Sequence, residues 1–174
     1  NHTADLVSAD FFTVPTITFR VMYVFVILSH CRREIIHFNV TENPTAQWTA
    51  QQLAEAFSFD TAPNYLLRDR DGIYGDRFRN RVKSLGIEEV LTAPGSPWQN
   101  PYVERIIGSI RRECLNHLII INERHLRQRL KCYSTYYHEV RTHLSLDKQS
   151  PVPRSIESSE QRQIVAIPHV GGLH

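Results

Sequence analysis

The chain has 174 residues, of which 41% are hydrophobic and 22% are charged, and its formal net charge is +2. This length fits one domain, and this apolar fraction can build a buried core, which excludes a disordered chain. No apolar run approaches a membrane span and no signal peptide is visible, so we expect no membrane partner. Because the chain starts at Asn1 rather than at a methionine, we interpret it as a fragment or a processed protein.

The cysteines and histidines give no sign of a disulfide or a zinc site. Cys31, Cys114 and Cys132 lack a paired spacing, which indicates reduced thiols in a cytoplasmic setting. Cys114 and His117 are three residues apart, but no second pair with zinc-ligand spacing accompanies them. We therefore expect no zinc in this protein.

The small net charge is unevenly distributed. Residues 101–150 carry nine basic and five acidic side chains, whereas residues 1–50 carry three and four, and residues 51–100 carry six and seven. A basic excess beside an acidic pocket suits a polyanion held against a metal site. A solvated helix face is the alternative explanation for so small an excess.

The first half of the chain reads as three strands and a helix. Residues 1–7 read as a leader, and residues 8–14 as a first strand with Asp10 on the same face as Phe12. Two further strands follow at 20–29 and 34–40, joined by a hairpin turn at 30–33. A helix is predicted over 45–57, where Trp48 is interpreted as a core anchor.

The second half alternates strands with helices. Strands are predicted at 65–69 and 88–92, with a helix at 76–85 between them and a Pro- and Gly-rich loop at 93–100. The next helix carries Glu104 near its start and ends near Leu115; its apolar stripe is Val103, Ile106, Ile107, Ile110 and Cys114. A last helix, from 123 to about 140, is capped by Asn122 and buries Leu126, Leu130, Tyr133 and Tyr137. We assign no function to the tail at 156–174, which has a possible short strand at 164–167.

Three carboxylates stand out in this arrangement. Asp10 lies inside an apolar strand, which costs free energy unless a cation or a positive charge satisfies it. Asp69 ends the fourth strand, and Glu104 lies off the buried stripe of its helix. An edge or cap position would ordinarily be the better interpretation of Asp10, but its two potential partners reverse that preference. Oxygen ligands of this kind suit Mg²⁺ or Mn²⁺ rather than zinc.

The order and spacing of these residues resemble the catalytic cores of retroviral-type integrases and DDE insertion-sequence transposases. Asp69 and Glu104 have 34 residues between them, and Tyr74 follows Asp69 by five, as in that family. Further matches lie in the loop before the glutamate and after the last helix: Pro97, Asn100, His143, Leu144, Ser145, Leu146 and Pro151. The resemblance covers roughly residues 5–155, so we expect one catalytic core at 1–155.

The resemblance implies a ribonuclease H-like α/β fold, a five-stranded mixed sheet flanked by helices, with the first strand beside the fourth. It implies that Asp10, Asp69 and Glu104 are both catalytic residues and ligands of two Mg²⁺ (or Mn²⁺) ions, and that the protein cleaves DNA strands and joins them. Asp71, which precedes Gly72, is instead interpreted as a turn residue.

The same resemblance implies the partners. They are double-stranded DNA, as mobile-element ends and target, and further copies of the chain, in the cytoplasm of a bacterium at its nucleoid. The residues expected to contact DNA are Gln99, Asn100, Arg105, Arg111 and Arg112. Two alternatives stay open: a ribonuclease H-like nuclease that cuts without joining, and a domesticated DNA-binding core that has lost its activity.

Overall fold

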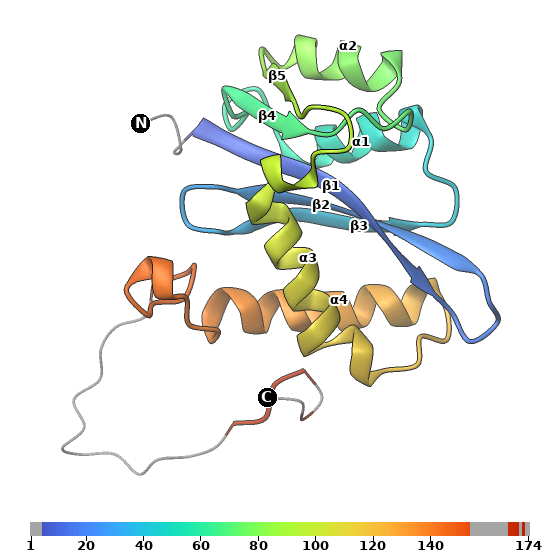
Figure 1. The fold of residues 1–174 in the computed structure, drawn as a ribbon, viewed down its shortest axis with the longest axis vertical. Coiled ribbons are helices and arrows are strands. Elements are labelled where there is room, and N and C mark those ends of the chain that lie inside the picture. Colours follow the sequence, from blue (N-terminus) through green and yellow to red (C-terminus); the bar gives the residue numbers. More distant parts are fainter. Residues whose placement is uncertain (1–4, 154–166, 171, 173–174) are drawn as a thin grey trace.

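The computed structural model describes residues 5–153, 167–170 and 172 of the chain. Five strands form one mixed sheet in the order β3-β2-β1-β4-β5 (Figure 1). Their bounds are β1 Leu6–Pro15, β2 Val21–Ser29, β3 Ile35–Thr41, β4 Tyr65–Arg68 and β5 Glu88–Leu91. The first three strands are antiparallel, while β4 is parallel to both β1 and β5. The predicted neighbourhood of the first and fourth strands is therefore confirmed.

The first strand begins earlier than its sequence predicts. Residues up to Val7 read as a leader, but β1 starts at Leu6, and Leu6, Val7 and Ser8 pair with Tyr65, Leu66 and Leu67 of β4. The pairing partner lies almost sixty residues further along the chain, so no local pattern reveals it. This early segment is what attaches the antiparallel hairpins to the parallel half of the sheet.

Helices cover both faces of the sheet. Their bounds are α1 Ala46–Ala56, α2 Asp76–Ser84, α3 Pro101–Glu113 and α4 Glu123–Glu139. The apolar residues of α3 and α4 form one core with Phe12 of β1 and Val24 of β2, and α3 crosses over α4 in Figure 1. The residues of α1 and α2 form a second core with Ala9 and Phe25, which alternate with the first set along the same strands. The two-faced sheet thus follows from the period of two in β1 and β2.

The predicted stripes and caps are confirmed. All five apolar residues predicted for the glutamate helix are buried, four of them within α3 and Cys114 at its C-cap, and so are all four predicted for α4. Asn122 caps α4, because its side-chain oxygen accepts the His125 backbone N–H at 2.9 Å. Trp48 is only half buried, packed against the second core rather than inside it.

Several predicted boundaries are wrong by a few residues. The glutamate helix ends at Glu113, and a 3₁₀ turn at Leu115–His117 follows it; the loop before it contains another at Pro97–Gln99. A third 3₁₀ turn, Leu144–Leu146, orders the segment after α4, where the sequence suggests a loosening chain. The possible strand at 164–167 lies almost wholly outside the described residues. Within the described ranges, no helix is long and apolar enough to cross a bilayer.

Candidate active site

Two of the three candidate carboxylates lie just beyond the point where the parallel pairing of β1 with β4 ends. The last paired residues of β1 and β4 are Ser8 and Leu67. Continuing this register by two residues brings Asp10 opposite Asp69, on strands about 4.8 Å apart. Side chains two positions beyond a pair point to the same side as that pair. The topology of the sheet therefore brings together two aspartates that are distant in sequence.

The third carboxylate comes from the helix that crosses this edge of the sheet. Glu104 lies in the first turn of α3, directly after the loop that follows β5. One pocket of about 410 Å³ joins the three side chains; its walls include Asp10, Asp69, Asp71, Thr92, Gly95, Asn100 and Glu104. The structure thus brings together all three residues that the sequence singles out.

Burial and neighbouring charge act on Asp10. Its pKa is raised to about 7, first by burial, and further by the carboxylates of Glu104, Asp69 and Asp71. The Phe11 backbone N–H donates to Asp10 Oδ1 at 2.7 Å and opposes this increase. Each of these three negative charges disfavours the ionisation of Asp10. A cation bound between the carboxylates would reverse this effect and favour the ionised form.

The donor set fits a hard divalent cation. It consists only of carboxylate oxygens, next to a pocket with room for further oxygen ligands. Among the described residues, no three His, Cys, Asp or Glu side chains are already close enough to hold a metal ion. Glu104 is exposed, so a change of its side-chain rotamer is the simplest way to complete such a set.

The raised pKa of Asp10 predicts a pH-dependent stability without metal. The folded protein binds the Asp10 proton more tightly than the unfolded chain, so the free energy of unfolding falls as pH rises from about 4 to about 7. Asp10→Asn mimics the protonated form. In EDTA, we expect this variant to be more stable than the wild type at pH 8 and to lose that advantage near pH 4.

Urea denaturation at pH 4, 6 and 8 measures this difference. Asp60→Asn, in the exposed turn after α1, removes the same charge away from the pocket and is the control. Equal stability of Asp10→Asn and wild type at pH 8 would contradict the buried, repelled state of Asp10. Added Mg²⁺ is expected to stabilise the wild type and to have little effect on Asp10→Asn.

Asp71 has a structural task beside Asp69. The Asp71 Oδ1 atom accepts the Ile73 backbone N–H at 2.9 Å, while Asp69 Oδ1 accepts the Asp71 N–H at 3.2 Å. Both are the bond of an Asx turn, in which a side-chain oxygen accepts the N–H two residues further on. Both side chains also border the pocket, so their positions are what distinguish them: Asp69 directly follows β4, which ends at Arg68, whereas Asp71 precedes the turn at Gly72.

A residue that the sequence did not indicate supports this strand end. Arg68, only 2% exposed, donates from Nε to Glu89 Oε2 at 2.6 Å and from Nη1 to the Asp69 carbonyl at 2.7 Å. Its guanidinium also lies over the Tyr74 ring, 4.8 Å from the centroid. In the sequence, the one sign of this role is an arginine at the end of an apolar strand. That sign can be interpreted only once β5 is known to lie beside β4.

Two buried polar atoms near the carboxylates lack a hydrogen-bond partner among the described residues. They are the Tyr74 hydroxyl and Asn100 Oδ1. Asn100 is 4% exposed and borders the pocket, and the charges of Asp10 and Asp69 both act on Tyr74. An unpaired buried acceptor at Asn100 is suited to a ligand that donates a hydrogen bond.

The residues expected to contact DNA do not form one group. Gln99 Oε1 accepts the Ala93 backbone N–H at 2.7 Å and so fastens the loop. Arg111 hydrogen-bonds to the Thr13 carbonyl at 3.4 Å, with its guanidinium 5.5 Å from the centre of the Phe12 ring. Arg105 and Arg112 border a different pocket, described below. Only Asn100 borders the carboxylate pocket directly.

In sequence, the chain is similar to proteins of mobile genetic elements. Residues 85–151 match the family model of the integrase core domain. A 39.2 kDa protein of insertion element IS476 from Xanthomonas euvesicatoria is 25% identical over 93% of this chain and 51% of its own length. InsK from Escherichia coli K12, described as a candidate transposase of insertion sequence element IS150, is 24% identical over 76% of this chain and 48% of its own length. The chain thus spans about half the length of these curated relatives.

Structural comparisons give the same fold. The catalytic core domain of HTLV-2 integrase, solved in complex with magnesium, aligns with a TM-score of 0.67 over 85% of this chain and 93% of that one, at 12% identity. The catalytic domain of the Mos1 mariner transposase aligns with a TM-score of 0.64 over 76% of this chain and 70% of that one, at 16% identity. The chain therefore has the ribonuclease H-like fold of these integrase and transposase cores, and in sequence it is similar to the integrase core domain over residues 85–151 and to proteins of bacterial insertion elements.

Proposed function

We propose that the chain is the catalytic core of a DDE transposase that cleaves and joins DNA strands, with Asp10, Asp69 and Glu104 as its metal ligands. The observation that carries the proposal is the single pocket bordered by these three carboxylates, beyond the end of the parallel pairing of β1 with β4. The sequence matches to insertion elements and the integrase core domain support the choice of DNA as substrate.

Two Mg²⁺ ions bound there would activate the attacking oxygen and stabilise the leaving oxygen of an in-line displacement at phosphorus. In this proposal Asp10 would be a ligand of both ions, while Asp69 and Glu104 would each hold one of them. Asn100 borders the same pocket, and its unpaired Oδ1 would accept a hydrogen bond from a donor of the substrate. The attacking group is water for strand cleavage and a DNA 3′-hydroxyl for joining, so no covalent enzyme intermediate is needed.

Two other activities fit the same fold. A ribonuclease H-like nuclease would cut without joining, and an inactive domesticated core would bind DNA without cutting. The assay that separates them uses a duplex with a pre-cleaved 3′ end, a plasmid target and Mg²⁺ or Mn²⁺. Joined products support the transposase, nicking alone supports the nuclease, and metal-independent binding without either supports the inactive core. Because the chain covers about half of its relatives, the assay is best made with the full-length transposase.

Asp69 rather than Asp71 is proposed as the second ligand. We expect Asp71→Asn to retain most of the cleavage activity, since an asparagine side-chain oxygen also accepts the Ile73 N–H and keeps the turn. Asp69→Asn is expected to lose the activity, because the amide replaces an anionic ligand. Calorimetric titration of both variants with Mg²⁺ compares them directly. If Asp71→Asn loses metal binding and Asp69→Asn keeps it, the assignment is two residues out of register.

A further inference from the structure

A second pocket, of about 390 Å³, lies along the face of α3 next to the one that carries Glu104. Its walls come from the β2–β3 turn, from α3, and from the end of α4 with the segment after it. Four arginines border it, and no aspartate or glutamate does; they are Arg33, Arg105, Arg112 and Arg141. The charged residues of this lining are basic, whereas those of the candidate active site are mainly acidic.

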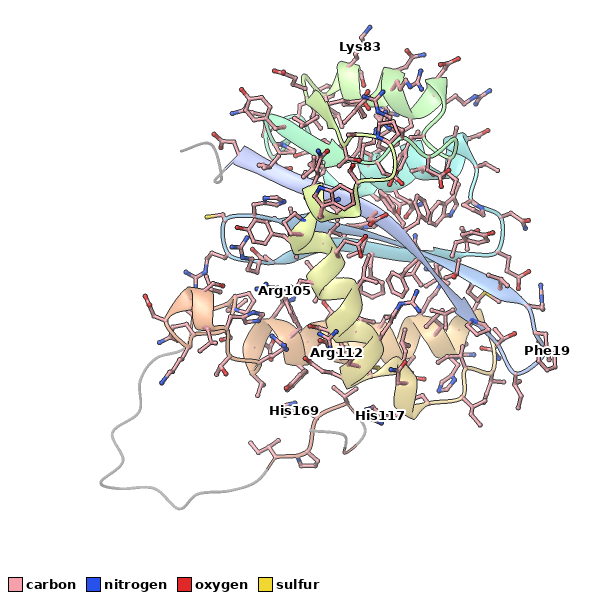
Figure 2. All side chains as sticks on the ribbon, viewed as in Figure 1. Phe19, Lys83, Arg105, Arg112, His117 and His169 are labelled. Carbon is pink, nitrogen blue, oxygen red and sulfur yellow. The ribbon has the colours of Figure 1, made fainter. Side chains whose placement is uncertain are left out.

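The helix itself separates the two pockets. Successive residues of an α-helix are about 100° apart, so Arg105 and Arg112 lie within about 20° of each other. Glu104 and Arg111 form a second row about 100° away on the same helix. Figure 2 labels Arg105 and Arg112 along α3. A polyanion that crosses α3 at Glu104 therefore meets the arginine row on the adjacent helix face.

Three of the four arginines keep their charge uncompensated. Arg141 is paired with Glu113, donating from Nε and Nη2 at 2.8 and 2.7 Å. Arg33, Arg105 and Arg112 take part in none of the ion pairs among the described residues. The Arg33 guanidinium lies over the Tyr102 ring, 3.4 Å from its centroid, and gives one N–H to the His30 carbonyl. A guanidinium has five N–H donors, so Arg33 is held in place with donors to spare.

Two nearby histidines have lowered pKa values, mainly because they are buried. Burial and, to a smaller extent, Arg33 together lower the pKa of His30 to about 4, and burial and Arg141 lower that of His143 to about 4. His143, which borders the pocket, has a buried Nε2 atom without a hydrogen-bond partner in the described structure. At neutral pH these two imidazoles carry no charge, so the positive charge at the pocket comes from its arginines.

We propose that this arginine pocket binds a backbone phosphate of the DNA whose reacting phosphodiester lies in the carboxylate pocket. The inference rests on the proposed function, and it adds Arg33 as a contact residue from outside α3. Planar guanidiniums match phosphate oxygens in pairs of hydrogen bonds. The common wall of the two pockets favours one continuous DNA strand over a separate acidic peptide.

A double-mutant cycle between protein and DNA tests this contact. The full-length transposase binds a duplex that carries a single uncharged methylphosphonate, moved along the strand one position at a time. For wild type, we expect that at one position, distant from the scissile phosphate, the methylphosphonate weakens binding severalfold. In Arg33→Gln, the methylphosphonate at that position should weaken binding no further. At every other position its effect on Arg33→Gln should equal its effect on wild type. Arg33→Gln should also lower the slope of log affinity against log salt by about 0.9, the value for one phosphate.

The controls separate a lost contact from lost charge or lost fold. Lys83→Gln, on α2 and labelled at the far end of the molecule in Figure 2, removes the same charge and should leave the cycle additive at every position. If Arg33→Gln unfolds, as judged by its melting temperature, Arg112→Gln takes its place in the cycle. Additive losses at every methylphosphonate position would overturn the proposal. It would also be overturned if Arg33→Gln lost the binding of an acidic peptide but kept that of DNA. Absence of any DNA binding by the wild type would instead contradict the proposed function.

Discussion

Asp10→Asn, Asp69→Asn and Glu104→Gln are each expected to abolish Mg²⁺-dependent cleavage and joining while the fold persists. Each change keeps the size of the side chain and removes one anionic oxygen ligand. A bound metal ion stabilises transition-state charge by several kcal/mol, and about 1.4 kcal/mol is a tenfold change in rate. We therefore expect a loss of roughly a thousandfold or more in joining rate for every variant, measured with pre-cleaved ends.

Matched substitutions show whether the loss is specific. Glu139 is exposed, at the end of α4 and far along the chain from the pocket. Glu139→Gln makes the same chemical change as Glu104→Gln, and this variant should keep full activity. Circular dichroism should show intact secondary structure for all variants. If one of the three carboxylate variants keeps wild-type activity, that residue has no part in the mechanism.

Glu89→Gln is expected to have the largest effect on stability. Arg68 is buried and Glu89 is its anionic partner, so this change leaves a buried guanidinium without a compensating charge. Breaking a buried ion pair from one side costs about 3–5 kcal/mol, and the partial exposure of Glu89 puts the expected loss near the lower end, about 3 kcal/mol. Weaker Mg²⁺ binding should accompany it, since Arg68 also holds the Asp69 carbonyl.

The neighbouring glutamate provides the control. Glu88 precedes Glu89 in β5 and is exposed, so Glu88→Gln should change the free energy of unfolding by less than about 0.5 kcal/mol. Urea denaturation of both variants gives the comparison. A loss for Glu89→Gln no larger than that for Glu88→Gln would mean that Arg68 finds its stabilisation elsewhere.

Local patterns in the sequence suffice for the elements and for the carboxylates. The helical spacing of Val103, Ile106 and Ile110 predicts which face of α3 is buried, and that face is buried in the structure. The period of two in β1 likewise places Asp10 on the face of Phe12, which packs against α3 and α4. The spacing between Asp69 and Glu104 identifies them as candidates through the resemblance to integrases and transposases, and both border one pocket.

Features that depend on distant pairing escape such patterns. Leu6 belongs to a strand only because β4 lies beside it, and Arg68 is tolerable in the core only because Glu89 of β5 is next to it. The arginine pocket is of the same kind, because Arg33, Arg112 and His143 come from three separate segments. A count of charges along the sequence indicates a basic excess at 101–150, but it cannot include Arg33.

The most direct measurement of the central claim is a crystal structure of this chain soaked in Mn²⁺, with anomalous scattering locating the ions. We expect manganese between Asp10, Asp69 and Glu104, with Glu104 turned toward the two aspartates and with oxygen ligands only. The same soak of Glu104→Gln should show weaker or missing density. Manganese bound by Asp71 in place of Asp69, or no manganese in this pocket at concentrations that support cleavage, would contradict the account.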